Sequence, residues 1–243
     1  MGGSAQSGAS AGTEPRHRRA CKRSLALATI AFACCAALAC HSAPPLADPD
    51  VDGQHASVWI AQLQSHDIYA RTRAAAELGK VGAPVVPRLR EVLRSDNPEV
   101  REQVVVALAM IGEPAIDALG DAMADKNVFV RKRAAAALVA MGAPAMPGFD
   151  QALERGDHNV RQDAVVALGK IGSPAIPRLE RALKDEDQRV RSDAVDALGS
   201  IGADAIPALR EAQNDEARPV RRSARRLLKK LDPSAPIDSS LDS

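Results

Sequence analysis

The chain has 243 residues, of which 46% are hydrophobic and only 2% aromatic, and it carries 32 basic and 31 acidic side chains. This composition fits a helical array better than a β-rich enzyme. Without residues 1–40, which hold five basic and one acidic side chain, 27 basic and 30 acidic side chains remain (32 − 5 and 31 − 1). This balance lacks the basic excess that nucleic-acid binding requires, so we expect no nucleic-acid partner.

Residues 1–40 have the features of an export signal. Basic residues between Arg16 and Arg23 precede an apolar run that ends at Ala39. A basic flank, a short apolar core and small residues at its end are typical of a secretory signal. The segment Ala37–Cys40 resembles the lipobox of bacterial lipoproteins, which implies a lipid on Cys40 and attachment to a membrane facing the periplasm. Ala37 departs from the leucine usual in that motif, so ordinary cleavage after Ala39 and an uncleaved anchor remain alternatives.

All four cysteines lie in this leader, so the rest of the chain uses neither disulfides nor thiolate metal sites. Residues 41–56 are rich in Pro, Ala and Asp without apolar periodicity, which predicts a flexible linker. Residues 57–64 match the second half of the repeat described next. We expect a half-repeat cap there, in which Trp59 seals the end of the core.

A repeat of 30 residues organises the chain from residue 57 to residue 232. Three of its columns are occupied by one residue type, namely Arg71, Arg101, Arg131, Arg161, Arg191 and Arg221; Leu78, Leu108, Leu138, Leu168, Leu198 and Leu228; and Gly82, Gly112, Gly142, Gly172 and Gly202. Identical residues at one fixed period are the signature of a solenoid.

Each repeat reads as two helices. Asp157 is a suitable N-cap, and the apolar residues that follow it recur at steps of three and four, as on one face of a helix. Gly172 can end that helix in a left-handed conformation. Pro174 and Pro177 then require a helix start, because proline fits only the first turn. A single hairpin cannot cover both of its apolar faces, so the hairpins must stack.

The motif D/N-x-x-V-R-x-x-A-x-x-A-L-G-x-I-G-x-P-A-I-P-x-L is clearest in Asp157–Leu183 and Asp187–Leu209. It resembles the HEAT-repeat superfamily, specifically its short phycobilisome-lyase HEAT-like repeats. The resemblance implies an all-α, right-handed α-solenoid of stacked antiparallel helix hairpins. We expect five hairpins between the half-repeat cap and a terminal helix at Pro219–Leu231, followed by a disordered tail over residues 233–243.

The arginine column is interpreted as structural. Each arginine lies four residues after the N-cap column, so its guanidinium can reach a cap carboxylate of its own or the adjacent repeat. The result would be a ladder along the array, as the resemblance to HEAT arrays also implies. The alternative is a row of anion-binding sites.

The resemblance places the second helices on the concave surface, where the repeats of this chain differ most. Their exposed positions predict a partner-binding face with alternating charge, made of Arg88, Arg90, Glu91 and Arg94 in the first hairpin, Asp121 and Asp125 in the second, Asp150 and Glu154 in the third, and Arg178, Glu180, Arg181 and Lys184 in the fourth. Variation on a shared scaffold is where specificity for a partner would lie.

We find no catalytic, cofactor-binding or metal-binding residues and expect no cofactor. The histidines are scattered, His–Glu pairs are absent, and no nucleophile elbow or phosphate loop occurs. We therefore expect a non-catalytic scaffold that binds a protein partner in the bacterial cell envelope. The alternative, implied by the resemblance, is an enzyme or accessory related to phycobilin lyases or deoxyhypusine-hydroxylase-like oxidoreductases.

The terminal helix has a basic outer face with Arg218, Arg222, Arg225, Arg226, Lys229 and Lys230. A polar cap on the last repeat is one interpretation. A patch for anionic lipid or an acidic partner is the other.

Overall fold

The computed structural model describes residues 48–51 and 54–234. The predicted leader with Cys40 and the predicted tail from residue 235 lie outside these residues. The chain divides into residues 1–45 and residues 46–243, and the described residues all belong to the second unit.

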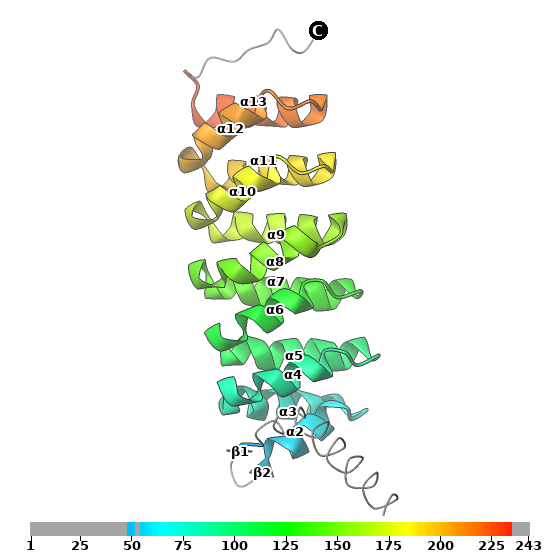
Figure 1. Ribbon diagram of the computed structural model, residues 1–243. Coiled ribbons are helices and arrows are strands. Elements are labelled where there is room, and N and C mark those ends of the chain that lie inside the picture. Colours follow the sequence, from blue (N-terminus) through cyan, green and yellow to red (C-terminus); the bar gives the residue numbers. More distant parts are fainter. Residues whose placement is uncertain (1–47, 52–53, 235–243) are drawn as a thin grey trace, which may run out of the picture. The chain divides into compact units, whose positions relative to one another are not determined.

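Two kinds of helix alternate along the array. The first helices are each 14 residues long: α3 (Ile68–Val81), α5 (Pro98–Ile111), α7 (Val128–Met141), α9 (His158–Ile171), α11 (Gln188–Ile201) and α13 (Arg218–Leu231). The second helices are shorter: α4 (Val86–Val92), α6 (Ile116–Ala122), α8 (Met146–Arg155), α10 (Ile176–Ala182) and α12 (Ile206–Ala212). The helix α2 (Ala56–Leu63) precedes α3. Together they form an all-α solenoid of stacked hairpins, as predicted (Figure 1).

The first helices start and stop where the sequence predicts. The carboxylate of Asp157 accepts a hydrogen bond from the backbone N–H of Val160 at 2.9 Å, so an otherwise unpaired donor in the first turn is satisfied. Gly172 ends the helix with φ 93° and ψ −151°. This is not the left-handed α conformation that we predicted, but an extended conformation with positive φ that is essentially restricted to glycine.

The second helices differ from the expectation of one continuous helix from the first proline. Pro174 lies in a 3₁₀ turn, Ser173–Ala175, and α10 begins only at Ile176. The N–H of Ala175 donates to the carbonyl of Gly172 at 2.9 Å, which is the tighter bonding of a 3₁₀ helix. Equivalent turns precede the other second helices: Ala83–Val85, Glu113–Ala115, Ala143–Ala145 and Ala203–Ala205.

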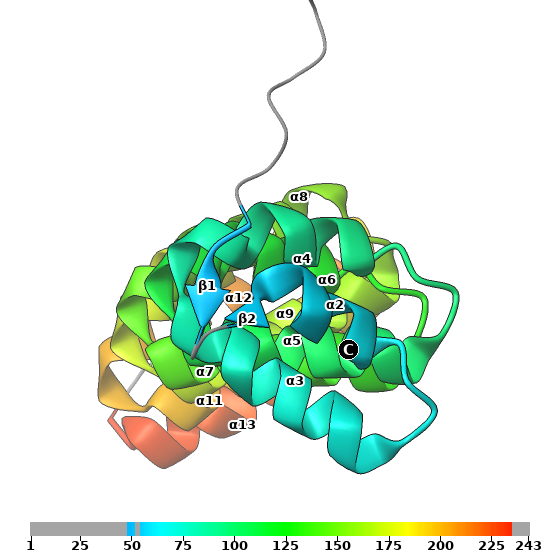
Figure 2. The ribbon, with the colours of Figure 1, turned by 90° about the horizontal axis from the view of Figure 1, so that it is seen from below.

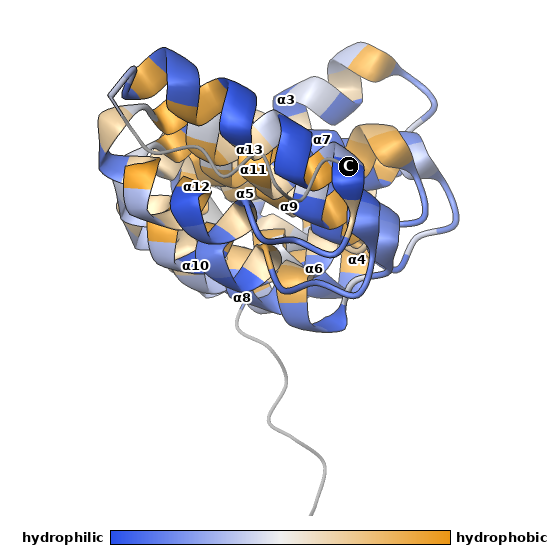
Figure 3. Ribbon diagram, turned by 90° about the horizontal axis from the view of Figure 1, so that it is seen from above, coloured by the Kyte–Doolittle hydropathy of each residue, from blue (hydrophilic) through white to orange (hydrophobic). Residues whose placement is uncertain are grey.

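The hydrophobic core lies between the layer of first helices and the layer of second helices (Figure 2). The leucine column is fully buried: Leu78, Leu108, Leu138, Leu168, Leu198 and Leu228 all have no exposed surface. Hydrophobic parts of the ribbons lie toward the space between the layers (Figure 3). The core therefore continues from one repeat to the next.

The N-terminal end of the array is covered by α2. Trp59 is 5% exposed, and the guanidinium of Arg73 lies 5.5 Å from the centroid of its ring. The residues before α2 were expected to be a flexible linker. In the structure Asp50–Val51 (β1) and Gln54–His55 (β2) pair as short antiparallel strands.

Asp48 also attaches this segment to the array. Its carboxylate accepts hydrogen bonds from the N–H of Ser57 at 2.8 Å and from Arg88 at 2.7 Å. Hydrogen bonds from the side chain and the backbone N–H of Ser57, aided by the charge of Arg88, lower the pKa of Asp48 below its ordinary value. Asp48 is thus attached to the array.

Candidate functional site

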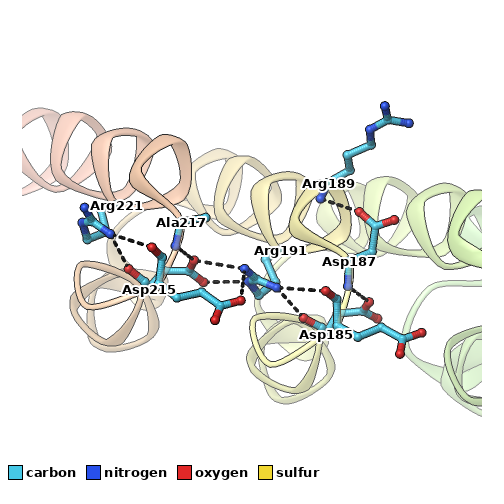
Figure 4. Close-up of polar contacts among 9 residues, drawn as sticks. Asp185, Asp187, Arg189, Arg191, Asp215, Ala217 and Arg221 are labelled. Carbon is cyan, nitrogen blue, oxygen red and sulfur yellow. Dashed lines mark hydrogen bonds and ion pairs between the residues drawn. The ribbon is translucent and has the colours of Figure 1, made fainter.

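The arginine column forms a continuous ladder, shown in part in Figure 4. One guanidinium nitrogen of Arg191 donates hydrogen bonds to the backbone carbonyls of Asp185 and Glu186, which precede its own helix. Its other nitrogens bond the carboxylates of Asp215 and Glu216 in the next repeat, at 2.8 Å each. One buried guanidinium therefore joins two neighbouring repeats.

The ladder carboxylates differ from those predicted. The sequence suggested cap carboxylates, but the cap side chains bond backbone N–H groups of their own helices. The arginines instead bond the residue two positions before the next cap, with Arg101 pairing with Asp125 and Arg161 with Asp185. The same aspartates accept the N–H of the cap residue, as Asp125 does from Asn127 at 2.7 Å. Asp125 is thus a ladder residue, and its side chain is only 9% exposed.

Two rungs use other carboxylates because that column lacks an aspartate. Ser95 follows Arg71, which bonds Glu99 at 2.6 Å instead. Arg155 follows Arg131, which bonds Asp163 at 2.8 Å. Arginine has no acceptor for the N–H of the cap residue.

The ladder arginines are held as cations. The hydrogen bonds that Arg101, Arg161 and Arg191 donate to Asp125, Asp185 and Asp215 raise the pKa of each arginine above its ordinary value, against the opposing effect of burial. Arg221, the last of the column, bonds the carbonyls of Asp215 and Glu216. These contacts account for the column as structure.

Most predicted partner-binding residues lie on the second helices, while Arg94, Asp125 and Lys184 lie in the turns that follow them. Many of these residues pair with each other. Arg90 of α4 donates to Asp121 of α6. Asp150 of α8 accepts from Arg178 of α10 at 2.8 Å and also from Arg181. The predicted alternation of charge is therefore largely neutralised between adjacent second helices.

Four predicted residues make no ion pair within the part of the chain that the structure describes. They are Glu91, Arg94, Glu180 and Lys184, and all but Glu180 are exposed. Glu154 lies 3.8 Å from Arg181, and both side chains are more than half exposed. Such exposed pairs contribute little to stability and can exchange partners. These side chains are available to a ligand.

Two crevices open on the second-helix face. The larger one, of about 360 Å³, lies between α4 and α6 and is lined by Arg90, Leu93, Arg94, Asp121, Ala122 and Asp125. The smaller one, of about 190 Å³, lies between α8 and α10 and is lined by Leu153, Glu154, Arg181, Ala182 and Asp185. Each has a leucine and an alanine below a charged rim. Sequence reasoning missed Leu93 and Leu153, although both are apolar residues next to the predicted charges.

Between the two crevices, α6 and α8 pack directly against each other. Glycine makes this possible, because a Cβ on Gly120 would lie 3.0 Å from the Cα of Gly148. This close contact lies between the two crevices, which are about two repeats apart.

The terminal helix α13 corrects one expectation. Arg225 was placed on the outer face, but it is only 6% exposed. It occupies the column of Val165 and Val195, which are fully buried. Arg222, Arg226, Lys229 and Lys230 are exposed as expected.

In residues 48–51 and 54–234, every helix is too short or too polar to span a bilayer. The same residues contain no cluster of three or more His, Cys, Asp or Glu side chains suited to a metal ion.

A family model described as HEAT repeats matches residues 56–142 and 146–229. The chain is a HEAT-repeat protein. The match covers most of the chain and includes all five hairpins and most of α13. No curated protein matches this HEAT-repeat protein.

Solved structures with 18–22% identity are similar to this chain. Human deoxyhypusine hydroxylase in complex with glycerol is 22% identical over 73% of this chain and 74% of that chain, with a TM-score of 0.43. The complex of CpcE and CpcF of phycocyanin lyase from Nostoc sp. PCC7120 is 22% identical over 78% and 82%, with a TM-score of 0.38. The MAST/Orbit N-terminal domain is 18% identical over 77% and 98%, with a TM-score of 0.49.

Proposed function

We propose that this HEAT-repeat protein is a non-catalytic scaffold of the bacterial cell envelope that binds a protein partner on its second-helix face. HEAT-repeat solenoids support protein binding in general, because stacked repeats present a long surface on a rigid frame. To this general role the proposal adds three points. The partner binds the second-helix face, which we expect to be the concave face; the protein is located in the cell envelope; and it catalyses no reaction.

The observation that carries the proposal is the pair of crevices on that face. Each combines a partly exposed leucine, Leu93 or Leu153, with charged residues at its rim. Charged side chains make up most of each lining, so charge rather than burial of apolar surface would contribute most to recognition of a partner. Side chains of a partner would fill the crevices, and ion pairs with Glu91, Arg94 and Lys184 would fix the position of the partner along the array.

The test is crosslinking capture from the native cell envelope with the full chain and two charge-matched variants. One variant carries Arg94→Glu and Lys184→Glu on the second-helix face. The control carries Lys132→Glu and Lys170→Glu, exposed lysines on the first helices α7 and α9. We expect one protein to be captured by the wild type and the control, and to be lost from the second-helix variant.

Capture by all three proteins alike, or loss from both variants, would rule out the second-helix face. Circular dichroism of both variants checks that the solenoid remains folded.

The envelope location is supported by the basic and apolar leader and by its lipobox-like end at Cys40. Lipid labelling of the wild type and of Cys40→Ser tests the anchor, and labelling that persists in the variant would remove it. Metal and chromophore analysis of the purified chain tests the non-catalytic role. Stoichiometric metal or bound pigment would favour the enzyme alternative.

A further inference from the structure

The charge of the chain is strongly segregated. The helix α13 holds seven basic and no acidic side chains. The rest of the chain after residue 40 holds 20 basic (27 − 7) and 30 acidic side chains. Solubility of a terminal repeat requires polar residues but not a single sign of charge. The uniform charge of α13 therefore calls for another explanation.

Four of these basic residues form one exposed face, which we call the basic face: Arg222, Arg226, Lys229 and Lys230. Their spacing of three and four residues puts them on one side of the helix. Arg226 lies 3.7 Å from Asp196, but both side chains are at least 60% exposed, so the pair is weak. Arg222, Lys229 and Lys230 make no ion pair with any described residue.

The basic face has no apolar anchor. The remaining exposed residues of α13 are Arg218 and Pro219, while Leu227 and Leu231 are partly buried against the core. Stable protein interfaces concentrate aromatic and aliphatic residues at their centre. A face of positive charge alone suits a surface that is itself a continuous field of negative charge.

We propose that the basic face binds a membrane surface that carries anionic phospholipids. Lys and Arg near such a surface each strengthen association about fivefold, and the attraction is screened by salt. The contact would be peripheral and reversible, because nothing on the face can enter the hydrocarbon layer. The choice of a lipid as the anionic partner rests on the envelope location in the proposed function.

The test measures binding of the full chain to vesicles of phosphatidylcholine alone and to vesicles that also contain phosphatidylglycerol. The variant carries Arg222→Gln, Lys229→Gln and Lys230→Gln. The matched control carries Lys126→Gln, Lys132→Gln and Lys170→Gln, which removes the same charge from exposed sites elsewhere on the array. The leader is the same in all three proteins, so its own affinity for lipid cancels.

We expect the preference for anionic vesicles to fall about a hundredfold in the α13 variant. The control should change only a few fold, and added salt should reduce the preference of the wild type. Equal loss in both variants would show an effect of net charge and overturn the proposal, and so would an unchanged α13 variant. An acidic protein bound through α13, with vesicle binding unaffected, would replace the membrane by a protein partner.

The α13 variant leaves the second-helix face unchanged. Failure here would leave the proposed scaffold standing, and failure of the capture experiment would leave this result unaffected.

Discussion

Arg101 and Asp125 show how single residues hold the array together. Two hydrogen bonds, of 2.6 and 2.8 Å, join them, and their side chains are only 3% and 9% exposed. Such a buried pair adds little net stability over an apolar one, but loss of one partner would cost about 3–5 kcal/mol, because a buried charge remains. We therefore expect the ladder to fix the register of neighbouring repeats more than it adds to their stability.

The cap residue Asp157 gives a prediction at the same scale. Hydrogen bonds from backbone N–H groups, first that of Val160, lower its pKa below the ordinary value. The stabilisation is thus present above the pKa of an unfolded aspartate, about 3.9, and is lost as the pH falls through the lower folded value. Asn127 fills the same column and accepts the same kind of bond without titrating.

We expect Asp157→Asn to match the wild type near neutral pH and to become the more stable of the two below about pH 4. Asp157→Ala should lower the free energy of unfolding by about 0.5–2 kcal/mol at neutral pH. Urea unfolding of the three proteins at several pH values measures this. A constant difference between wild type and Asp157→Asn at all pH values would contradict the assignment.

At the residue scale, the sequence predicts the roles of residues that recur at the same position of every repeat. The caps and the arginine column stand out because each stays in one column, and their contacts with the backbone are local. The ladder carboxylates were missed because they depend on the offset between neighbouring helices. Arg101 and Arg131 use Asp125 and Asp163, which belong to different columns. The aspartates two positions before the cap were the available signal.

Among the elements, α6 and α8 stand out because glycine brings their backbones together. In a helix, Gly→Ala gains about 1 kcal/mol from propensity alone. Here a Cβ on Gly120 would lie 3.0 Å from both the Cα and the carbonyl oxygen of Gly148. Backbone atoms cannot turn aside, so overpacking of about 1–3 kcal/mol should exceed the gain.

Gly199 is the matched control. A Cβ there would meet the side chain of Leu227 at 2.5 Å, near the end of the array where that side chain can rotate. We expect Gly120→Ala to lower the free energy of unfolding by about 1 kcal/mol, and Gly199→Ala to leave it unchanged or raise it slightly. Denaturant unfolding of the wild type and both variants measures these free energies. Stabilisation by both changes would show that α6 and α8 can separate freely.

Element boundaries were only partly predictable. The prolines correctly marked a helix start, but a 3₁₀ turn precedes each second helix, a detail of bonding geometry that proline permits without dictating. The length of α8 was also missed. It continues to Arg155, where other repeats have Ser or Asp that accepts the N–H of the cap residue.

Stability of the whole array should be distributed rather than global, because each repeat contacts only its neighbours. Leu168 is fully buried in α9, and Leu168→Ala should cost about 2–5 kcal/mol through lost burial and the remaining cavity. Native-state hydrogen exchange should show loosening centred on that repeat and its two neighbours.

Leu78→Ala is the matched control, because Leu78 fills the same column and is equally buried. Its loosening should be centred on α3, three repeats away. Uniform loosening along the array in either variant would mean that the solenoid unfolds as one unit.

The solenoid as a whole was predictable from one period and three columns of residues. The proposed binding face stays a prediction, and the sequence did not reveal how its charged residues pair. These residues form ion pairs between α4 and α6 and between α8 and α10, and the crevices depend on where neighbouring second helices separate. Such spacing follows from packing between repeats, which a single sequence does not display.

The ladder has a consequence for how such a chain can evolve. Three of its pairs join residues 24 apart, which is less than one repeat: Arg101–Asp125, Arg161–Asp185 and Arg191–Asp215. Loss of residues 188–217 would place Arg221 behind Asp185 and Glu186, the two carbonyls that Arg191 now uses. Gene segments that encode one repeat can thus be duplicated or deleted without disturbing the joins on either side. The third repeat has Arg155 in place of this aspartate, and its Arg131 pairs with Asp163 instead. Duplication or deletion of that repeat would therefore be tolerated less well.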